Sequence, residues 1–156
     1  MIFFLHGLES NPISDKSQYL KSIGDCYCPQ MDYQNTELFG KILNDVIDKK
    51  PTLLIGSSMG GWFAYCLSTI TGIPTLLFNP AFHSRSIEPN VLIGNKLSNH
   101  TIIFGETDSV INPNQSVMWL NENGIGSFEY HYDLHGHTTP IDIFKKWVDV
   151  YVITEN

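Results

Sequence analysis

The sequence has little positive charge. Among its 156 residues Arg85 is the only arginine, and the formal net charge is −7. Proteins that bind nucleic acids gather lysine and arginine on one face to contact phosphates, and the lysines here form no dense cluster. The composition therefore argues against a nucleic-acid partner.

Cysteines and long apolar runs are also scarce. Three cysteines, an odd number, do not form a disulfide framework, so we expect reduced thiols in a cytoplasmic protein. The apolar start at residues 1–5 is too short for the core of a signal peptide. No apolar run approaches the ~20 residues that a membrane-spanning helix needs. We therefore expect a soluble protein with no membrane span.

Apolar residues are plentiful, and they occur in short runs and in segments with helical spacing. Hydrophobic residues make up 42% of the chain and charged residues 16%, which is typical of a packed globular protein. A chain of this length suits one core, so we expect a single domain over residues 1–156. Short apolar runs alternate with longer segments of helical periodicity, which predicts βα units on a mostly parallel sheet.

The predicted fold is α/β, with a minimal, mostly parallel sheet of about six strands and helices on both faces. The expected strands are 2–5, 25–28, 52–56, 74–78, 101–104 and 127–132, and the expected helices are 14–23, 36–49, 60–71, 113–123 and 138–152. Residues 81–100 have no clear periodicity. They predict a loop with at most one short helix, which leaves no room for a large cap domain.

A G-x-S-x-G frame carries the strongest chemical signal. The sequence Gly-Ser-Ser-Met-Gly at residues 56–60 fits this frame only with Ser58 at its centre. The frame lies where an expected strand ends and an expected helix begins, which is the context that a nucleophilic serine requires. The alternative is a glycine-rich turn with an idle serine. We predict that Ser58 is the nucleophile.

A serine hydroxyl needs a base that takes its proton. His137 follows the last expected strand, at the carboxyl edge of the sheet where doubly wound folds place their sites. His135 lies two residues earlier and remains the alternative base. We predict that His137 is the base.

The third member of such a site is a carboxylate that orients the imidazole. Asp108 and Glu106 both follow the expected strand 101–104. Asp108 is preferred because it lies deeper in the loop, whereas Glu106 stands at the exit of the strand. The order Ser58, Asp108, His137 is typical of α/β-hydrolases.

Acyl transfer also requires donors for the negative charge that develops on the carbonyl oxygen. The backbone amides of Leu8, which follows the first strand, and Met59, which follows the nucleophile, are the expected oxyanion donors. The residues expected to rim an open, shallow substrate pocket are Leu8, Phe82, His83, Val110 and Ile111.

A metal site is the other arrangement that the histidines allow. His131, Asp133, His135 and His137 alternate, so on one continuous strand they would share a face. The strand is expected to end near Gly136, so we predict no metal ligands here.

Several segments together resemble the YqiA-like small esterase family of the α/β-hydrolase superfamily. The matching segments are 4–12, 56–64, 78–81, 105–108 and 136–137, which span nearly the whole chain. The resemblance implies hydrolysis of acyl esters or thioesters without a metal or organic cofactor. It also implies that Ser58 is the nucleophile, Asp108 the acid and His137 the base.

The predicted function is therefore that of a serine esterase or thioesterase acting on a small-molecule acyl substrate through an acyl-enzyme on Ser58. Two alternatives remain open at this point. One is a non-catalytic binding protein that shares the α/β-hydrolase fold, since a fold alone does not establish activity. The other is an acyltransferase or a peptidase that uses the same three residues.

Overall fold

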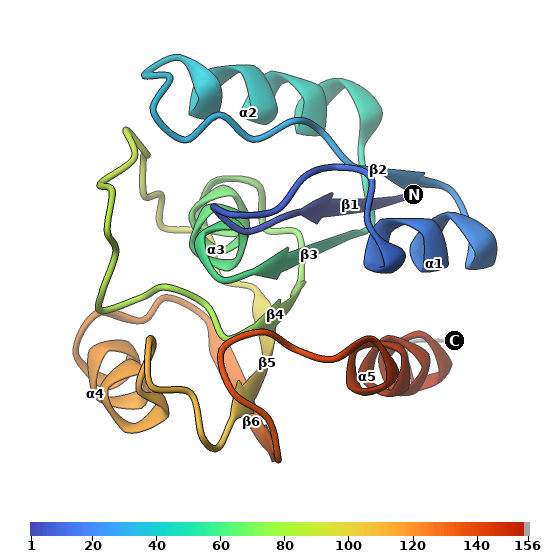
Figure 1. The fold of residues 1–156 in the computed structure, drawn as a ribbon. Helices are drawn as coiled ribbons and strands as arrows, with labels where there is room; N and C mark the ends of the chain where they lie inside the picture. Colours follow the sequence, from blue (N-terminus) through green and yellow to red (C-terminus); the bar gives the residue numbers. More distant parts are fainter. Residues whose placement is uncertain (155–156) are drawn as a thin grey trace.

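Strands and helices alternate along the chain, except that the fourth and fifth strands have no helix between them, in the structure, a computed structural model that describes residues 1–154 (Figure 1). All the predicted elements are present, with bounds that differ from the predicted ones by three residues at most. The strands are β1 (Ile2–Leu5), β2 (Cys26–Tyr27), β3 (Leu53–Ser57), β4 (Thr75–Phe78), β5 (Asn99–Gly105) and β6 (Ser127–Asp133). The helices are α1 (Asp15–Ile23), α2 (Leu38–Lys49), α3 (Met59–Thr71), α4 (Pro113–Asn123) and α5 (Ile141–Thr154).

The six strands form one sheet in the order β2-β1-β3-β4-β5-β6, and every neighbouring pair is parallel. Strands β1, β3, β4 and β5 lie inside the sheet and consist mostly of buried residues. Parallel strands are covered on both faces, which explains why these segments read as continuous apolar runs. All carboxyl ends of the strands therefore meet at one edge, and the loops that follow them share that edge.

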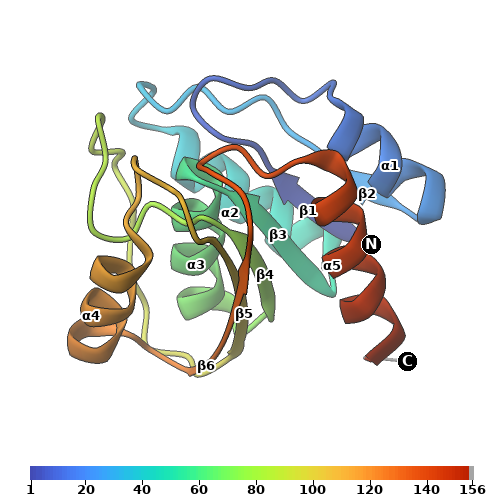
Figure 2. The same ribbon diagram turned by 60° about the horizontal axis from the view of Figure 1, so that its bottom comes forward.

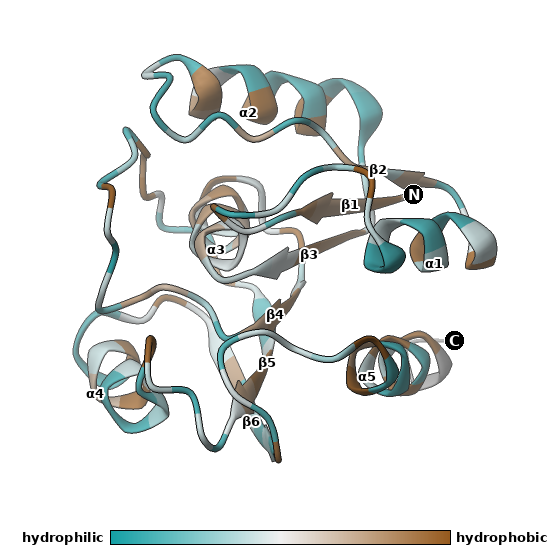
Figure 3. Cartoon of the chain, in the orientation of Figure 1, coloured by the Kyte–Doolittle hydropathy of each residue, from teal (hydrophilic) through white to brown (hydrophobic). Residues whose placement is uncertain are grey.

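Helices cover both faces of the sheet, as predicted. Helices α2, α3 and α4 lie on one face, and α1 and α5 lie on the other (Figures 1 and 2). Successive strand residues alternate between the two resulting cores: Phe3 and Leu5 belong to the core under α2–α4, and Phe4 belongs to the core under α1 and α5. Figure 3 shows the strands mostly apolar and α2 divided into an apolar and a polar face.

Residues 79–98, between β4 and β5, form a loop without a helix, in agreement with the predicted loop. One local expectation needs correction. The last helix begins at Ile141 and not at Thr138. The reason is Pro140, because a proline disfavours helical backbone at the residue before it. Residues 138–140 instead prolong the loop that follows β6. No helix within residues 1–154 has the length and apolar character required to cross a membrane.

Candidate active site

Ser58 occupies a sharp turn between β3 and α3. Its backbone has φ 54° and ψ −116°, a conformation that non-glycine residues rarely adopt. The turn brings strand and helix so close that two neighbours must be glycine. A Cβ on Gly56 would lie 2.3 Å from the Gly60 oxygen, and a Cβ on Gly60 would lie 1.9 Å from the Leu5 oxygen. This is the strand-turn-helix geometry that presents a serine hydroxyl above the sheet edge.

The structure brings Ser58, His137 and Asp108 together, although they lie far apart in the sequence. The Ser58 Oγ and His137 Nε2 atoms are 2.8 Å apart, and His137 Nδ1 is 2.8 Å from Asp108 Oδ2. A carboxylate only accepts hydrogen bonds, so the proton of the neutral ring lies on Nδ1. Nε2 then accepts the hydrogen bond from the Ser58 hydroxyl. This hydrogen-bond order lets the imidazole take the serine proton.

Burial and backbone amides fix the carboxylate. The side chain of Asp108 has no exposed surface, whereas 27% of the His137 side chain is exposed. The second carboxylate oxygen, Oδ1, accepts hydrogen bonds from the amides of Val110 (2.8 Å) and Ile111 (2.9 Å). Glu106, the alternative acid, is exposed and is not hydrogen-bonded to His137. The geometry therefore selects Asp108 as the partner of the imidazole.

His135, the alternative base, lies in a different environment. It is buried, and its Nδ1 donates a hydrogen bond to the Gly136 carbonyl at 2.7 Å. Its Nε2 has no hydrogen-bond partner in the described part of the chain. The ring lies against Gly105, where a Cβ would come within 2.7 Å of His135 Nδ1. His135 is thus packed within the loop, and of these two histidines it is His137 that reaches Ser58.

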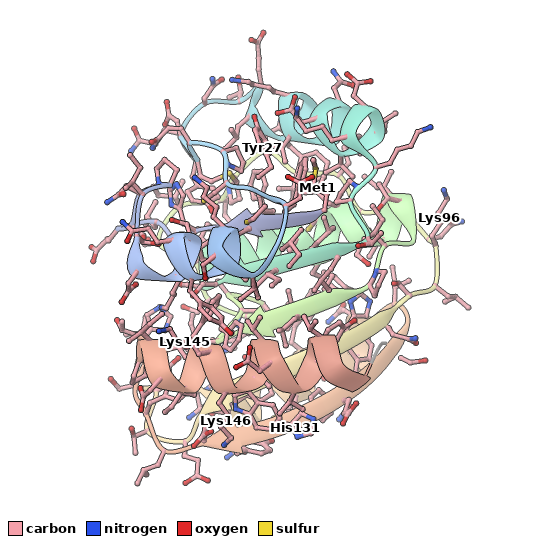
Figure 4. The ribbon with its side chains drawn as sticks, turned by 90° about the vertical axis from the view of Figure 1, so that its right-hand side faces the viewer. Met1, Tyr27, Lys96, His131, Lys145 and Lys146 are labelled. Carbon is pink, nitrogen blue, oxygen red and sulfur yellow. The ribbon has the colours of Figure 1, made fainter. Side chains whose placement is uncertain are left out.

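The four alternating residues at the end of β6 have separate partners. His131 contacts Glu129 and packs on Trp147 of α5, with a ring-centroid distance of 4.4 Å. Asp133 accepts hydrogen bonds from Lys146 (2.7 Å) and Trp147 (3.1 Å), and its pKa is lowered mainly by the bond from Lys146. Figure 4 shows His131 beside α5, the helix that carries Lys146. Within residues 1–154, no three His, Cys, Asp or Glu side chains gather at a metal-binding distance.

A cavity of about 710 Å³ opens over Ser58 and His137. Four of the predicted oxyanion and rim residues line it: Leu8, Met59, Val110 and Ile111. Their exposure differs, because Leu8 and Val110 are exposed at the mouth whereas Met59 and Ile111 are buried. The cavity wall thus includes apolar side chains among its polar ones.

Phe82 and His83 do not line this cavity, and their predicted place at its rim is wrong. Phe82 is fully buried and stacks on Trp119 of α4, with ring centroids 5.2 Å apart. Ser84, Arg85 and Ser86 of the same loop line the cavity in their place. The segment had no periodicity in the sequence, so nothing local distinguished its core residues from its cavity residues.

Sequence reasoning also missed two cations in the cavity wall, Arg85 and Lys16. The Arg85 guanidinium is held by Glu88 at 3.0 Å, by the carbonyls of residues 81 and 82, and by the face of Trp62 at 4.4 Å. Burial lowers the pKa of Lys16. In the sequence, the one hint of this part of the wall was the rarity of arginine, since Arg85 is the only one in a chain with few cations.

The loop after β1 lies directly beside the nucleophile. A Cβ built on Gly7 would lie 3.5 Å from the Ser58 Cβ, so the backbone that leads to Leu8 passes next to the serine. His6 holds this loop: its Nδ1 donates to the Gly7 carbonyl at 2.9 Å, and its Nε2 accepts from the Met31 amide at 3.3 Å. Burial lowers the pKa of His6, which favours the neutral ring that this pair of hydrogen bonds requires.

Solved structures of the same fold cover nearly the whole chain. A Xanthomonas campestris pv. campestris protein assigned to the alpha/beta superfamily of hydrolases has a TM-score of 0.70 at 16% identity, with 96% of each chain covered. Est1E from Butyrivibrio proteoclasticus has a TM-score of 0.70 at 14% identity, covering 98% of this chain and 86% of that one. The carboxylesterase of Bacillus cereus has a TM-score of 0.64 at 17% identity, covering 96% and 86%. At these identities the likeness establishes the α/β-hydrolase fold.

Sequence comparison gives the family. No curated protein matches the chain. Residues 1–100, more than half of the 156, match the model of the uncharacterised protein family UPF0227. Together with the fold, this match confirms the resemblance seen in the motifs. The chain belongs to UPF0227, the YqiA-like family of α/β-hydrolases.

Proposed function

We propose that this protein is a serine esterase or thioesterase that cleaves a small acyl substrate through an acyl-enzyme on Ser58. One observation carries the proposal: the hydroxyl of Ser58 and the carboxylate of Asp108 each lie 2.8 Å from opposite nitrogens of the His137 ring. The strained turn that presents Ser58 to the cavity supports the same function. Esterases among the solved structures of this fold are in agreement with it.

In the first half of the proposed reaction, Ser58 Oγ attacks the carbonyl carbon while His137 Nε2 takes the hydroxyl proton. Asp108 stabilises the imidazolium that forms, because its carboxylate accepts the hydrogen bond from Nδ1. The imidazolium then gives its proton to the leaving alcohol or thiol as the bond to the carbonyl carbon breaks. An acyl group remains on Ser58.

In the second half, His137 takes a proton from a water molecule that attacks the acyl carbon, and then returns it to Ser58 as the acid leaves. Both halves pass through a tetrahedral oxyanion. The amides of Leu8 and Met59 are the proposed donors: Met59 is the first residue of α3, and the backbone before Leu8 runs beside Ser58. Each such donor contributes about 3 kcal/mol of transition-state stabilisation.

The cavity wall supports an acyl substrate of modest size. Leu8, Val110 and Ile111 offer an apolar surface for the acyl chain near Ser58. The loop between β4 and β5 has no helix that would roof the cavity. We therefore expect short acyl chains to be hydrolysed faster than long ones.

A fluorophosphonate probe tests the nucleophile, because it labels only a serine whose hydroxyl is activated by a base. We expect the wild type to be labelled and the Ser58→Ala variant to lose both labelling and ester hydrolysis, the latter by about 10⁴-fold or more. Ser57→Ala is the matched control, since Ser57 lies next in the chain and also lines the cavity. It should retain both. A folded wild-type protein that is not labelled would instead favour the non-catalytic binding protein.

A substrate panel separates the remaining enzymatic alternatives. Nitrophenyl esters and acyl thioesters of increasing chain length, each tested with the wild type and with Ser58→Ala, give the preferred bond and acyl length. Adding a competing alcohol or amine separates an acyltransferase from a hydrolase, because a transferase forms the acylated acceptor in place of the free acid. Cleavage of peptide amides at rates above those of the esters would identify a peptidase.

A further inference from the structure

The segment that follows β4 contacts the backbone around the nucleophile. The Ser58 amide donates a hydrogen bond to the Phe78 carbonyl at 2.9 Å, and the Ala81 amide donates one to the Ser58 carbonyl at 3.0 Å. Pro80 packs on the first turn of α3, where a Cβ on Gly61 would lie 2.9 Å from the Pro80 Cβ. Residues 78–81 therefore support the strained turn from one side.

Asn79, in the middle of this segment, connects the other two parts of the site. It is buried, with 1% of its surface exposed. Its side-chain nitrogen donates hydrogen bonds to the carbonyls of His137 (2.8 Å) and Gly136 (3.3 Å), and lies 3.5 Å from Thr139 Oγ1. Its side-chain oxygen accepts a hydrogen bond from the amide of Gly105 at 2.7 Å. Gly105 ends β5, the strand that leads to Asp108.

Several other bonds hold the start of the loop that carries His137: the His135 amide donates to the Asp133 carbonyl at 3.0 Å, and His135 Nδ1 donates to the Gly136 carbonyl at 2.7 Å. Residues 134–140 lie in neither a helix nor a strand. The Thr107 amide donates a hydrogen bond to the His135 carbonyl at 3.2 Å, and Asn79 provides the bonds to residues 136 and 137. At His137 itself, Asn79 gives the one hydrogen bond to the backbone carbonyl among the described residues, and the ring must meet two partners at 2.8 Å.

We propose that Asn79 is a positioning residue for the reaction: it holds the backbone of His137 in register with the strand end that leads to Asp108. The inference rests on the proposed function, but the effect of Asn79 on the position of the His137 ring can be measured without any turnover. Asn79 touches neither Ser58 Oγ nor the imidazole, so it acts through the loop. A displacement of about 1 Å at a catalytic group can lower the rate by about 10²-fold.

Only an amide meets the requirements of this position. The side chain must donate on one side, to two carbonyl oxygens, and accept on the other, from an N–H group. An aspartate has the same shape but would place a second oxygen against the carbonyls of Gly136 and His137. The backbone φ of 45° at Asn79 is also in the left-handed region, which asparagine tolerates better than most residues.

The isosteric variant Asn79→Asp is the direct test. We expect kcat for an activated ester to fall by about 10- to 100-fold while KM stays within about twofold, because the cavity walls are unchanged. Thr75→Val is the matched control. Thr75 begins β4, the strand that precedes Asn79, is also buried and hydrogen-bonds His100, so its loss lowers stability without touching the site. Its kcat should stay within about twofold of the wild type.

A second variant and a second readout keep the test decisive. Asn79→Gly removes the side chain and suits the positive φ, so it replaces Asn79→Asp if the latter does not fold. NMR of the His137 ring nitrogens reports its tautomer without any turnover: the wild type should show one fixed Nδ1–H tautomer and the variants a mixture. A wild-type kcat together with an unchanged ring signal in a folded Asn79 variant would overturn the proposal. An inactive wild type with a fixed tautomer that the variants lose would reject the proposed function alone.

Discussion

A hydrogen-bonded histidine lies at each edge of the sheet, His137 in the loop after β6 at the carboxyl edge and His100 near the start of β5 at the amino edge, and a similar pattern of bonds surrounds both rings. At the carboxyl end, the Ser58 hydroxyl donates to one nitrogen of His137, and the other nitrogen donates to Asp108. At the amino end, the Thr75 hydroxyl and His100 Nδ1 lie 2.9 Å apart, and His100 Nε2 donates to the Ile125 carbonyl at 3.0 Å. Hydroxyl, imidazole and oxygen acceptor are present at both ends.

The differences lie in the acceptor and in access. His100 has a neutral carbonyl as its acceptor, is 1% exposed and stacks on Phe128. Burial lowers its pKa to about 4, so this ring resists taking a proton. His137 has a carboxylate acceptor and opens to the cavity. A hydroxyl beside an imidazole is therefore not sufficient for a nucleophile: the ring also needs a negative acceptor that stabilises its charged form, and a substrate must reach the hydroxyl.

Replacing the two rings in turn gives the largest expected contrast. His137→Asn removes the proposed base, the one imidazole among the described residues that hydrogen-bonds Ser58, so we expect ester hydrolysis to fall by about 10⁴-fold or more. His100→Asn should lower the melting temperature and leave kcat within about twofold. His135→Asn belongs in the same series, because its ring is buried and does not reach the serine. Equal losses of activity from the His135 and His137 variants would contradict the assigned base.

Replacing the carboxylate that accepts the hydrogen bond from His137 makes this network resemble the one around His100. Asp108→Asn gives His137 a neutral partner, as His100 has, and the NH₂ group of the asparagine favours the wrong tautomer of the ring. One oxygen remains to accept the amides of Val110 and Ile111, so the loop should persist. We expect kcat to fall by about 10³- to 10⁴-fold with little change in melting temperature. Glu106→Gln, at the exposed alternative acid, should leave kcat unchanged; if it were as damaging as Asp108→Asn, the assigned acid would be wrong.

At the carboxyl edge of the sheet, the backbones of β1 and α3 pack closely beside the nucleophile turn. Gly60→Ala places a methyl group 1.9 Å from the Leu5 oxygen. We expect a loss of about 3 kcal/mol in the free energy of unfolding, because neither the strand nor the helix can yield easily. Gly40→Ala is the control in another helix: a Cβ there meets nothing within 4 Å. The Gly40→Ala variant should gain up to about 1 kcal/mol in its free energy of unfolding, because alanine has the higher helix propensity. Urea unfolding measures both, and a neutral Gly60→Ala would show that the turn is less crowded than described.

Local patterns explain why most of the fold was predictable. The buried strands read as apolar runs and the helices as periodic segments, because each pattern belongs to a few neighbouring residues. The positions of Ser58, Asp108 and His137 followed from the loops that parallel strands bring to one edge. The structure then added what no neighbour could indicate: Phe82 turns into the core, and Asn79 bonds residues 26 and 58 positions away. Such contacts depend on tertiary packing and leave no periodic trace.

The pH dependence of stability gives the smallest expected effect and tests the amino-end network alone. The pKa of His100 is about 4 in the folded protein against an ordinary value of 6.5, so between these values the unfolded chain binds more protons. Stability from this group is complete above pH 6.5 and is lost as the pH falls toward 4. At pH 5 we expect a free energy of unfolding about 2 kcal/mol below that at pH 8 from His100 alone. Other groups also titrate in this range, so the informative quantity is the difference between the urea unfolding curves of the wild type and His100→Asn. If both proteins lose the same stability between pH 8 and pH 5, burial does not hold His100 neutral. The difference between His100 and His137 then lies in their hydrogen-bond acceptors, a carbonyl and a carboxylate.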